Sequence, residues 1–218
     1  MRILGLSGAT KVISLGLIDD ENLIAETTVS DIHSEKIMFY VKEAGIEPSQ
    51  IEGVAVASGP GSYSGLRGSL AAAKSLAQTL NVPLTGVSTL EAIAYNLIDS
   101  EGTIMVVLDA RADEYNCALF GASQGKLKRL TADVMMKLAA LKERVAGISG
   151  EIWLTGNTKE LRELKGSNFH FAEEVHGHPY GTNVARIGLE KIKAGKIDDP
   201  LKLLPLYSHQ PNIREFNQ

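Results

Sequence analysis

The sequence predicts an α/β protein built from two similar lobes that meet near residue 100. Each half of the chain opens with two short apolar runs joined by a charged turn, which is typical of a β-hairpin. Each half then alternates helical and strand patterns, and no linker rich in Pro, Gly and Ser separates them. We therefore expect residues 1–100 to form the N-terminal lobe and residues 101–218 a smaller C-terminal lobe.

The bulk composition excludes several classes of protein. The chain has 218 residues and a net charge of −4, and a mildly acidic chain is not expected to grip nucleic acid unaided, because phosphate contacts need clustered Lys and Arg. No apolar run approaches the ~20 residues that span a bilayer, and the N-terminal segment is too quickly polar for a signal peptide. The single cysteine, Cys117, has no disulfide partner. A soluble, cytoplasmic protein is expected.

In the first half, five strands and three helices are predicted in order. Asp31 is a plausible N-cap for the first helix, and Gly45 is placed to end it as a C′ glycine. Ser88 and Glu91 have the spacing of a capping box, which opens the third helix. The predicted strands are residues 2–6, 11–18, 22–29, 54–57 and 83–87, and the predicted helices are residues 32–44, 64–80 and 88–97.

The second half repeats the opening hairpin and then becomes harder to interpret. Residues 127–144 are expected to hold a short strand and then a helix, and the proline-containing tail is expected to be extended. His176 and His178 bracket a glycine in a polar loop, where they are expected to be solvated rather than to bind metal. The other predicted elements are strands at 103–108, 114–120 and 151–154 and a helix at 183–194.

The turn GPGSYSG at residues 59–65 lies between a strand and a helix, which suits the backbone N–H groups of an anion site. The Walker pattern needs Lys and then Ser or Thr after its last glycine, whereas Leu66 and Arg67 follow here. The dinucleotide fingerprint needs an acidic residue at the end of the next strand, and none is present. The nucleophile elbow G-x-S-x-G is not matched around Ser62 or Ser64.

The helix at residues 64–80 has two faces that can pack. One stripe is apolar and forms a core face, while a neighbouring stripe consists of the small residues Gly68, Ala71, Ala72 and Ser75. The helix at residues 32–44 also has more apolar surface than one core stripe needs. These second faces suit either burial inside the chain or burial against a partner, and the residues alone favour neither.

Several segments together resemble the bacterial TsaB (YeaZ) family. The match is densest through about residue 120 and is specific as a combination. It rests on ILGLSGATKVISLGL at the start of the chain, IHSEKIM at residues 32–38, GPGSYSGLRGSL at 59–70, GVSTLEAIA at 86–94, VVLDARADEYNCALF at 106–120 and PLY at 205–207.

The resemblance implies two ribonuclease-H-like lobes of the actin, Hsp70 and sugar-kinase ATPase class. It also implies a role in forming threonylcarbamoyladenosine beside the anticodon of tRNAs that read codons starting with A. In this family the protein is a non-catalytic activator that binds TsaD, meets TsaE through the TsaB–TsaD complex, and forms homodimers. Contact with tRNA is then indirect and no membrane is involved, and no cofactor is expected beyond weak binding of ATP or ADP, or binding shared with the partner.

The family's contact helices map onto the two helices of the first half. The partner interface implied in this sequence comprises Ile32, Lys36, Phe39, Tyr40, Gly68, Ala71, Ala72 and Ser75. The glycine turn is then expected chiefly to bring the second helix close to its partner. As a lesser alternative, a vestigial anion or nucleotide contact would involve Gly59, Gly61, Ser62 and Gly65.

Two departures from the family patterns argue against a catalytic set and against a metal site. TsaD holds its metal through H-x-x-x-H, whereas here His33 is followed by Ile37. The family usually begins with Asp-Thr where this chain has Ser7 and Gly8, so the carboxylate that the ATPase class uses near its phosphates is missing. The competing hypothesis, a metallopeptidase-like or ATPase enzyme in its own right, would need one of these groups.

Overall fold

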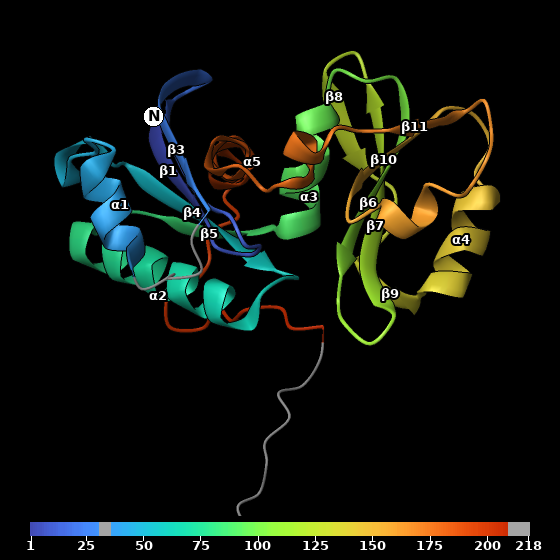
Figure 1. Ribbon diagram of the computed structural model, residues 1–218. Coiled ribbons are helices and arrows are strands. Elements are labelled where there is room, and N and C mark those ends of the chain that lie inside the picture. Colours follow the sequence, from blue (N-terminus) through green and yellow to red (C-terminus); the bar gives the residue numbers. More distant parts are fainter. Residues whose placement is uncertain (31–35, 209–218) are drawn as a thin grey trace, which may run out of the picture.

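The computed structural model describes residues 1–30 and 36–208 and contains two β-sheets (Figure 1). The first sheet has the strand order β3-β2-β1-β4-β5, in which β1 pairs antiparallel with β2 and parallel with β4. Strand β4 is buried along its whole length and β2 along all but its last residue, because helices cover both faces. The strands are β1 (Arg2–Ser7), β2 (Ile13–Asp19), β3 (Asn22–Val29), β4 (Gly53–Gly59) and β5 (Leu84–Ser88).

Helices α1 (Ile37–Glu43) and α2 (Tyr63–Leu80) lie on one face of this sheet, and α5 (Gly181–Lys193) lies on the other (Figure 1). Each face therefore has its own apolar cluster, one beneath α1 and α2 and the other beneath α5. A one-turn 3₁₀ helix, η2 (Pro48–Gln50), precedes β4. After β5 the chain forms the short helix α3 (Thr89–Ala94) and the 3₁₀ turn η3 (Tyr95–Leu97), and then enters the second sheet.

The second sheet repeats the order of the first. It runs β11-β10-β6-β7-β8, so its opening strand β6 is central, the next two lie antiparallel on one side, and β10 and β11 lie parallel on the other. Strand β9 also pairs with β7. The elements are β6 (Gly102–Asp109), β7 (Glu114–Ser123), β8 (Lys126–Arg129), β9 (Val134–Lys137), α4 (Leu138–Ala146), β10 (Ile152–Gly156), η4 (Lys159–Leu161), β11 (Phe169–Phe171) and η5 (Glu174–Gly177).

Most predicted elements are confirmed within one or two residues, and β3 matches without change. Gly45 has φ +70° and follows α1 as the predicted C′ glycine. Ser88 caps α3 by accepting the Glu91 N–H, but the Glu91 carboxylate pairs with Arg129 instead of completing the capping box. Strands β9 and β11 were not predicted. The Asp31 cap lies outside the described residues.

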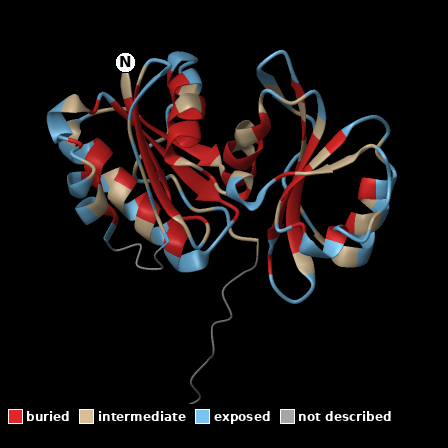
Figure 2. Ribbon diagram, turned by 45° about the horizontal axis from the view of Figure 1, so that its top comes forward, coloured by how far each residue is buried: buried red, intermediate tan, exposed pale blue. Residues whose placement is uncertain are grey.

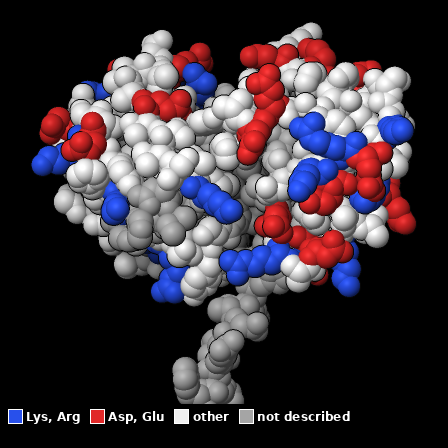
Figure 3. Space-filling view, viewed as in Figure 1, with Lys and Arg blue, Asp and Glu red and all other residues white. Residues whose placement is uncertain are grey.

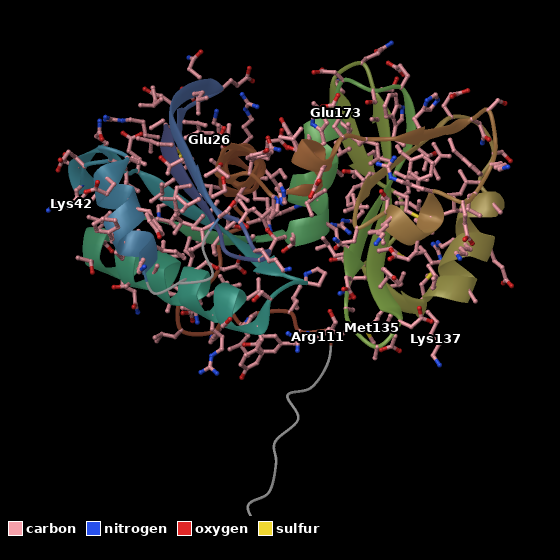
Figure 4. All side chains as sticks on the ribbon, viewed as in Figure 1. Glu26, Lys42, Arg111, Met135, Lys137 and Glu173 are labelled. Atoms are coloured by element: carbon pink, nitrogen blue, oxygen red, sulfur yellow. The ribbon has the colours of Figure 1, made fainter. Side chains whose placement is uncertain are left out.

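The last helix departs from the expected division of the chain. The residues of α5 belong to the predicted C-terminal lobe, yet the helix packs on β1, β2, β4 and β5 of the first sheet. Gly5 and Gly16 allow this, since a Cβ on Gly5 would collide with the backbone at Gly181 and Ala185, and one on Gly16 with the backbone at Gly181 and Thr182. Strand β3 contributes a cap, because the Glu26 carboxylate accepts the Thr182 N–H (Figure 4). The two sheets separate near residue 100, but the C-terminal segment returns to the first lobe.

Helix α3 lies between the lobes and is almost wholly buried (Figure 2). Leu90 and Ile93 pack with residues of the second sheet, whereas Ala92 packs in the cluster beneath α5. A helix from the first half of the chain thus completes the core of the second lobe. Across residues 1–30 and 36–208, no helix is long and apolar enough to cross a membrane.

Candidate functional site

Helix α2 begins and ends on clear local signals. The Ser62 hydroxyl caps its first turn by accepting the Gly65 N–H at 3.4 Å, and Asn81 ends it in the left-handed region at φ 53°. Its core face packs against the first sheet, as the apolar stripe predicts. The buried residues of the helix are Gly65, Leu66, Ser69, Leu70, Ala73, Leu76 and Ala77.

The small-residue stripe of α2 points outward. Ala71 and Ser75 are exposed, while Gly68 and Ala72 are half-buried. The alternative that this second face is buried inside the chain is therefore wrong for the described residues. Because its side chains are short, an approaching helix could pack close to the α2 backbone.

Helix α1 adds bulky apolar side chains beside this stripe. Ile37 and Val41 are buried in the core, whereas Phe39 is 56% exposed and Met38 is exposed as well. Tyr40 is half-buried and meets the Phe39 ring edge to face at 5.6 Å. Helices α1 and α2 are in contact and lie on the same face of the sheet (Figure 1). We call this surface the α1–α2 face; its described residues are Lys36, Met38, Phe39, Tyr40, Gly68, Ala71, Ala72 and Ser75.

Of the predicted interface residues, Ile32 lies outside the described part of the chain, and the other seven lie together on the α1–α2 face. Sequence reasoning did not include Met38 in that interface, although it lies one residue before Phe39 and is exposed in the same helix. The signal for it was present, because an apolar residue at a position off the core stripe needs a cover.

The glycine turn makes its close contacts within the chain. A Cβ on Gly65 would collide with the Gly8 carbonyl oxygen, and one on Gly59, at φ +124°, would collide with that of Leu206. The Ser62 N–H donates to Ala9 O at 2.7 Å, which ties the turn to the β1–β2 loop. The glycines themselves approach the chain's own backbone, and the expectation that the turn brings α2 close to a partner stays a prediction.

The same geometry bears on the lesser alternative, an anion site. Two of the four backbone amides proposed for it, those of Ser62 and Gly65, already donate hydrogen bonds inside the chain. The anion contact stays a prediction, with two amides engaged elsewhere.

An aromatic cluster at the start of α2 holds the end of the C-terminal segment. Tyr63 and Tyr207 lie with their ring centroids 4.7 Å apart, and the Arg67 guanidinium lies over the Tyr63 ring and donates to its hydroxyl. Burial raises the pKa of Tyr207 above its usual value. Leu206 N–H donates to Ser58 O at 2.7 Å, so backbone and side chains together fasten residues 206–207 beside the glycine turn.

The positions that would carry metal or phosphate chemistry hold packing residues instead. Ile37, where the second histidine of H-x-x-x-H would stand, is buried in the first core cluster. Ser7 is fully buried, and its hydroxyl accepts the Ala9 N–H at 3.4 Å. No group of three or more His, Cys, Asp or Glu placed to hold a metal ion occurs among residues 1–30 and 36–208.

The thiol of the buried Cys117 is unreactive. Burial in β7 raises the pKa of its thiol to about 11, well above the ordinary value for cysteine. His176 and His178 are half-buried rather than solvated, so their prediction as solvent-exposed loop residues is wrong. Their backbone carbonyls take part in contacts between the lobes.

Taken together, the two sheets define an α/β protein of two ribonuclease-H-like lobes, each with the same strand order and directions. The solved structure of YeaZ from Pseudomonas aeruginosa has this fold, with a TM-score of 0.80, 19% sequence identity, and coverage of 94% of this chain and 99% of that chain. The model of the family TsaD, tRNA N6-adenosine threonylcarbamoyltransferase, matches residues 24–186, well over half of the chain.

Comparison with curated relatives shows which group of proteins within that family the chain is similar to. The chain is 27% identical to the tRNA threonylcarbamoyladenosine biosynthesis protein TsaB of Bacillus subtilis, over 93% of this chain and 95% of that protein. It is 29% identical to TsaB of Escherichia coli, over 72% of this chain and 71% of that protein. The chain therefore belongs to the TsaD family and, within it, to the TsaB (YeaZ) proteins.

Proposed function

We propose that this chain acts in the biosynthesis of tRNA threonylcarbamoyladenosine as a non-catalytic partner of TsaD. Its relatives in Bacillus subtilis and Escherichia coli carry the name of that pathway, and the matching family model is that of the transferase TsaD. Chain and transferase are thus related, and related chains that share a helical face can pair through it. Cytoplasmic location, TsaE as a further component and homodimer formation belong to this proposal.

The α1–α2 face is the observation that carries the proposal. It combines exposed apolar side chains, Met38 and Phe39, with a strip of small residues on α2 that permits close approach of another helix. Exposed aromatic and Met side chains next to a flat strip are characteristic of the centre of protein interfaces. Lys36 stands at the edge of this face, where a charged rim residue is expected.

A non-catalytic role is supported by what occupies the catalytic positions of the family. Ile37 is part of the core and Ser7 is engaged in a local turn, so neither position presents a metal ligand or a carboxylate. The chain is then proposed to transfer nothing by itself and to bind ATP or ADP weakly or jointly with TsaD. Contact with tRNA would come through the complex; on the face of the chain seen in Figure 3, acidic side chains lie among the basic ones.

The test is reconstitution of threonylcarbamoyladenosine formation from purified TsaC, TsaD, TsaE and this chain on a tRNA that reads codons starting with A. Modification is expected to depend on this chain, and the chain alone is expected to show no turnover. Equal modification without the chain, or turnover by the chain alone, would overturn the proposal.

A variant pair locates the interface. Ala72→Arg places a long charged side chain in the middle of the α1–α2 face and is expected to abolish rescue, because an unpaired charge buried in an interface core opposes binding. Ala146→Arg makes the same change at an exposed position of α4 in the other lobe and is expected to rescue fully. Circular dichroism checks that both variants are folded. Full rescue by folded Ala72→Arg would remove the α1–α2 face from the proposal.

A further inference from the structure

The two lobes are joined by two crossings of the chain. The first runs from α3 through η3 into β6, and the second returns from β11 through η5 to α5. Glu173, labelled in Figure 4, stands at the beginning of η5 in the returning crossing. Any rotation of one lobe against the other has to bend both crossings together.

One side chain joins these crossings. The Asn96 amide, in η3, donates from Nδ2 to the carbonyl oxygens of His176 and His178, both at 2.8 Å. Its Oδ1 accepts from Nδ2 of Asn183, in the first turn of α5, at 2.5 Å. The first crossing, the second crossing and the helix that follows are therefore bonded through a single residue.

The surroundings of Asn96 extend this contact to both lobes. Asn183 is buried, and its Nδ2 also donates to Ala92 O in α3 at 3.2 Å. From the second sheet, Thr155 Oγ1 donates to His176 O at 3.0 Å. The bond from Asn183 to Ala92 is buried and the others are partly buried, and hydrogen bonds withdrawn from water are costly to break without a replacement partner, so this network resists opening.

The histidine loop has hydrogen bonds of its own, from the His176 N–H to Glu173 O at 3.0 Å and from the Tyr180 N–H to His178 O at 3.1 Å, but one of its buried atoms lacks a partner within the described part of the chain. Nδ1 of His178 is buried and has no hydrogen-bond partner among the described residues. A buried polar atom without a partner opposes the observed position of a loop rather than favouring it. The carbonyl contacts to Asn96 and Thr155 are the hydrogen bonds that connect this loop to η3 and to the second sheet.

Apolar packing works in the same direction. Leu90 and Ile93 of α3 are part of the core of the second lobe, together with Phe120, while Ala92 of the same helix is part of the core beneath α5. Because cores pack closely and do not slide freely, a helix shared by two cores restrains the angle between them.

We propose that Asn96 is a clasp that locks the two lobes at one fixed angle, so that this chain is a single rigid body. Enzymes that bind ligands between two domains commonly close around them by hinge bending. This chain instead presents its surfaces in one preformed arrangement. The inference rests on the contacts of Asn96 and stands whether or not the proposed function is correct.

The experiment is a spin-label distance measurement on the full chain. Lys196→Cys, beyond α5, and Glu143→Cys, in α4, place one exposed label on each lobe. Cys117 is buried and its thiol pKa is high, so it stays unlabelled. The doubly labelled chain is expected to give one narrow distance distribution. A broad or two-peaked distribution would show that the lobes are not locked, and would overturn the proposal.

Asn96→Leu in the labelled chain keeps the size of the side chain and removes its donors and acceptor. The distribution is expected to broaden or shift, and the His176 and Tyr180 amides are expected to exchange with solvent about 5- to 30-fold faster. Asn168→Leu is the matched control, because Asn168 donates to Gly150 O at 2.9 Å within the second lobe alone. It is expected to leave the interlobe distance unchanged.

A distribution for folded Asn96→Leu as narrow and as centred as that of the parent would overturn the clasp. If Asn96→Leu does not fold, Asn183→Leu carries the test, since it removes one bond of the clasp and leaves the two bonds to the histidine loop. The distance distribution of Asn183→Leu is expected to broaden, but less than it would if all the hydrogen bonds of Asn96 were lost. An unchanged distribution counts against the proposal.

Discussion

The two lobes have the same strand order but differ in what covers their sheets. The N-terminal sheet has α1 and the 18-residue α2 on one face and α5 on the other. In the C-terminal lobe, the connection that corresponds to α2 is only the 3₁₀ turn at Lys159–Leu161. One face of the C-terminal sheet is covered by α3, which comes from the first half of the chain.

This difference shows that strand order and helical cover are separable properties of the fold. Pairing between backbones sets the order, and any apolar element of suitable length can cover the resulting face. Each sheet takes one helical cover from the other half of the chain, α5 for the N-terminal sheet and α3 for the C-terminal sheet, while α2 of the N-terminal lobe also has a second, outward face. We therefore expect the C-terminal lobe to depend on the N-terminal lobe for its stability.

The largest effect is expected where the second lobe borrows its core. Leu90→Ala removes a fully buried side chain of α3 and is expected to lower the free energy of unfolding by about 2–5 kcal/mol. Urea unfolding followed by circular dichroism and by the fluorescence of Trp153, in the second lobe, is expected to give one coincident transition.

Leu201→Ala is the matched control, because Leu201 is 79% exposed and its truncation is expected to change stability by no more than about 0.5 kcal/mol. Separate transitions from the two probes would show that the lobes unfold independently. The expectation that the C-terminal lobe depends on the N-terminal lobe for its stability would then be wrong.

A smaller effect is expected from glycines in the second strand of each lobe. Gly16→Ala in β2 places a methyl group against the backbone of α5 and is expected to cost about 1–3 kcal/mol. Gly121→Ala in β7 meets only the Leu130 side chain at ordinary contact distance and is expected to be nearly neutral. Denaturation midpoints compare the two, and equal losses would contradict the close approach of α5 to Gly16.

The smallest effect concerns the titration of Cys117, in the second lobe. Burial raises its thiol pKa to about 11 in the folded chain, so the unfolded chain ionises first as pH rises. The stability that the protonated Cys117 thiol contributes is fully present below the pKa of the unfolded chain and is lost as pH rises from about 9 towards 11. The parent is expected to lose more stability over that range than Cys117→Ala does. Parallel curves would contradict the burial of the thiol.

How much of this structure the sequence predicts depends on how far apart in the sequence the interacting residues are. The cap at Ser88 and the terminator at Gly45 act over three or four residues, and both are confirmed, although the Glu91 half of the predicted capping box is not formed. The apolar stripes of α1 and α2 are periodic over a single helix, so their core and outward faces were also predictable. Strand β11 was missed because three residues of ordinary composition carry no periodicity of their own.

The sequence by itself therefore determined the hairpin that opens each lobe, the helices and their faces, and the family to which the chain belongs. Only the tertiary structure decided that α5 returns to the first sheet, that the glycine turn contacts its own chain, and that Asn96 joins the two crossings. The physical reason is distance along the chain. Asn96 and His176 lie 80 residues apart, and their contact depends on where two sheets bring them rather than on any local pattern.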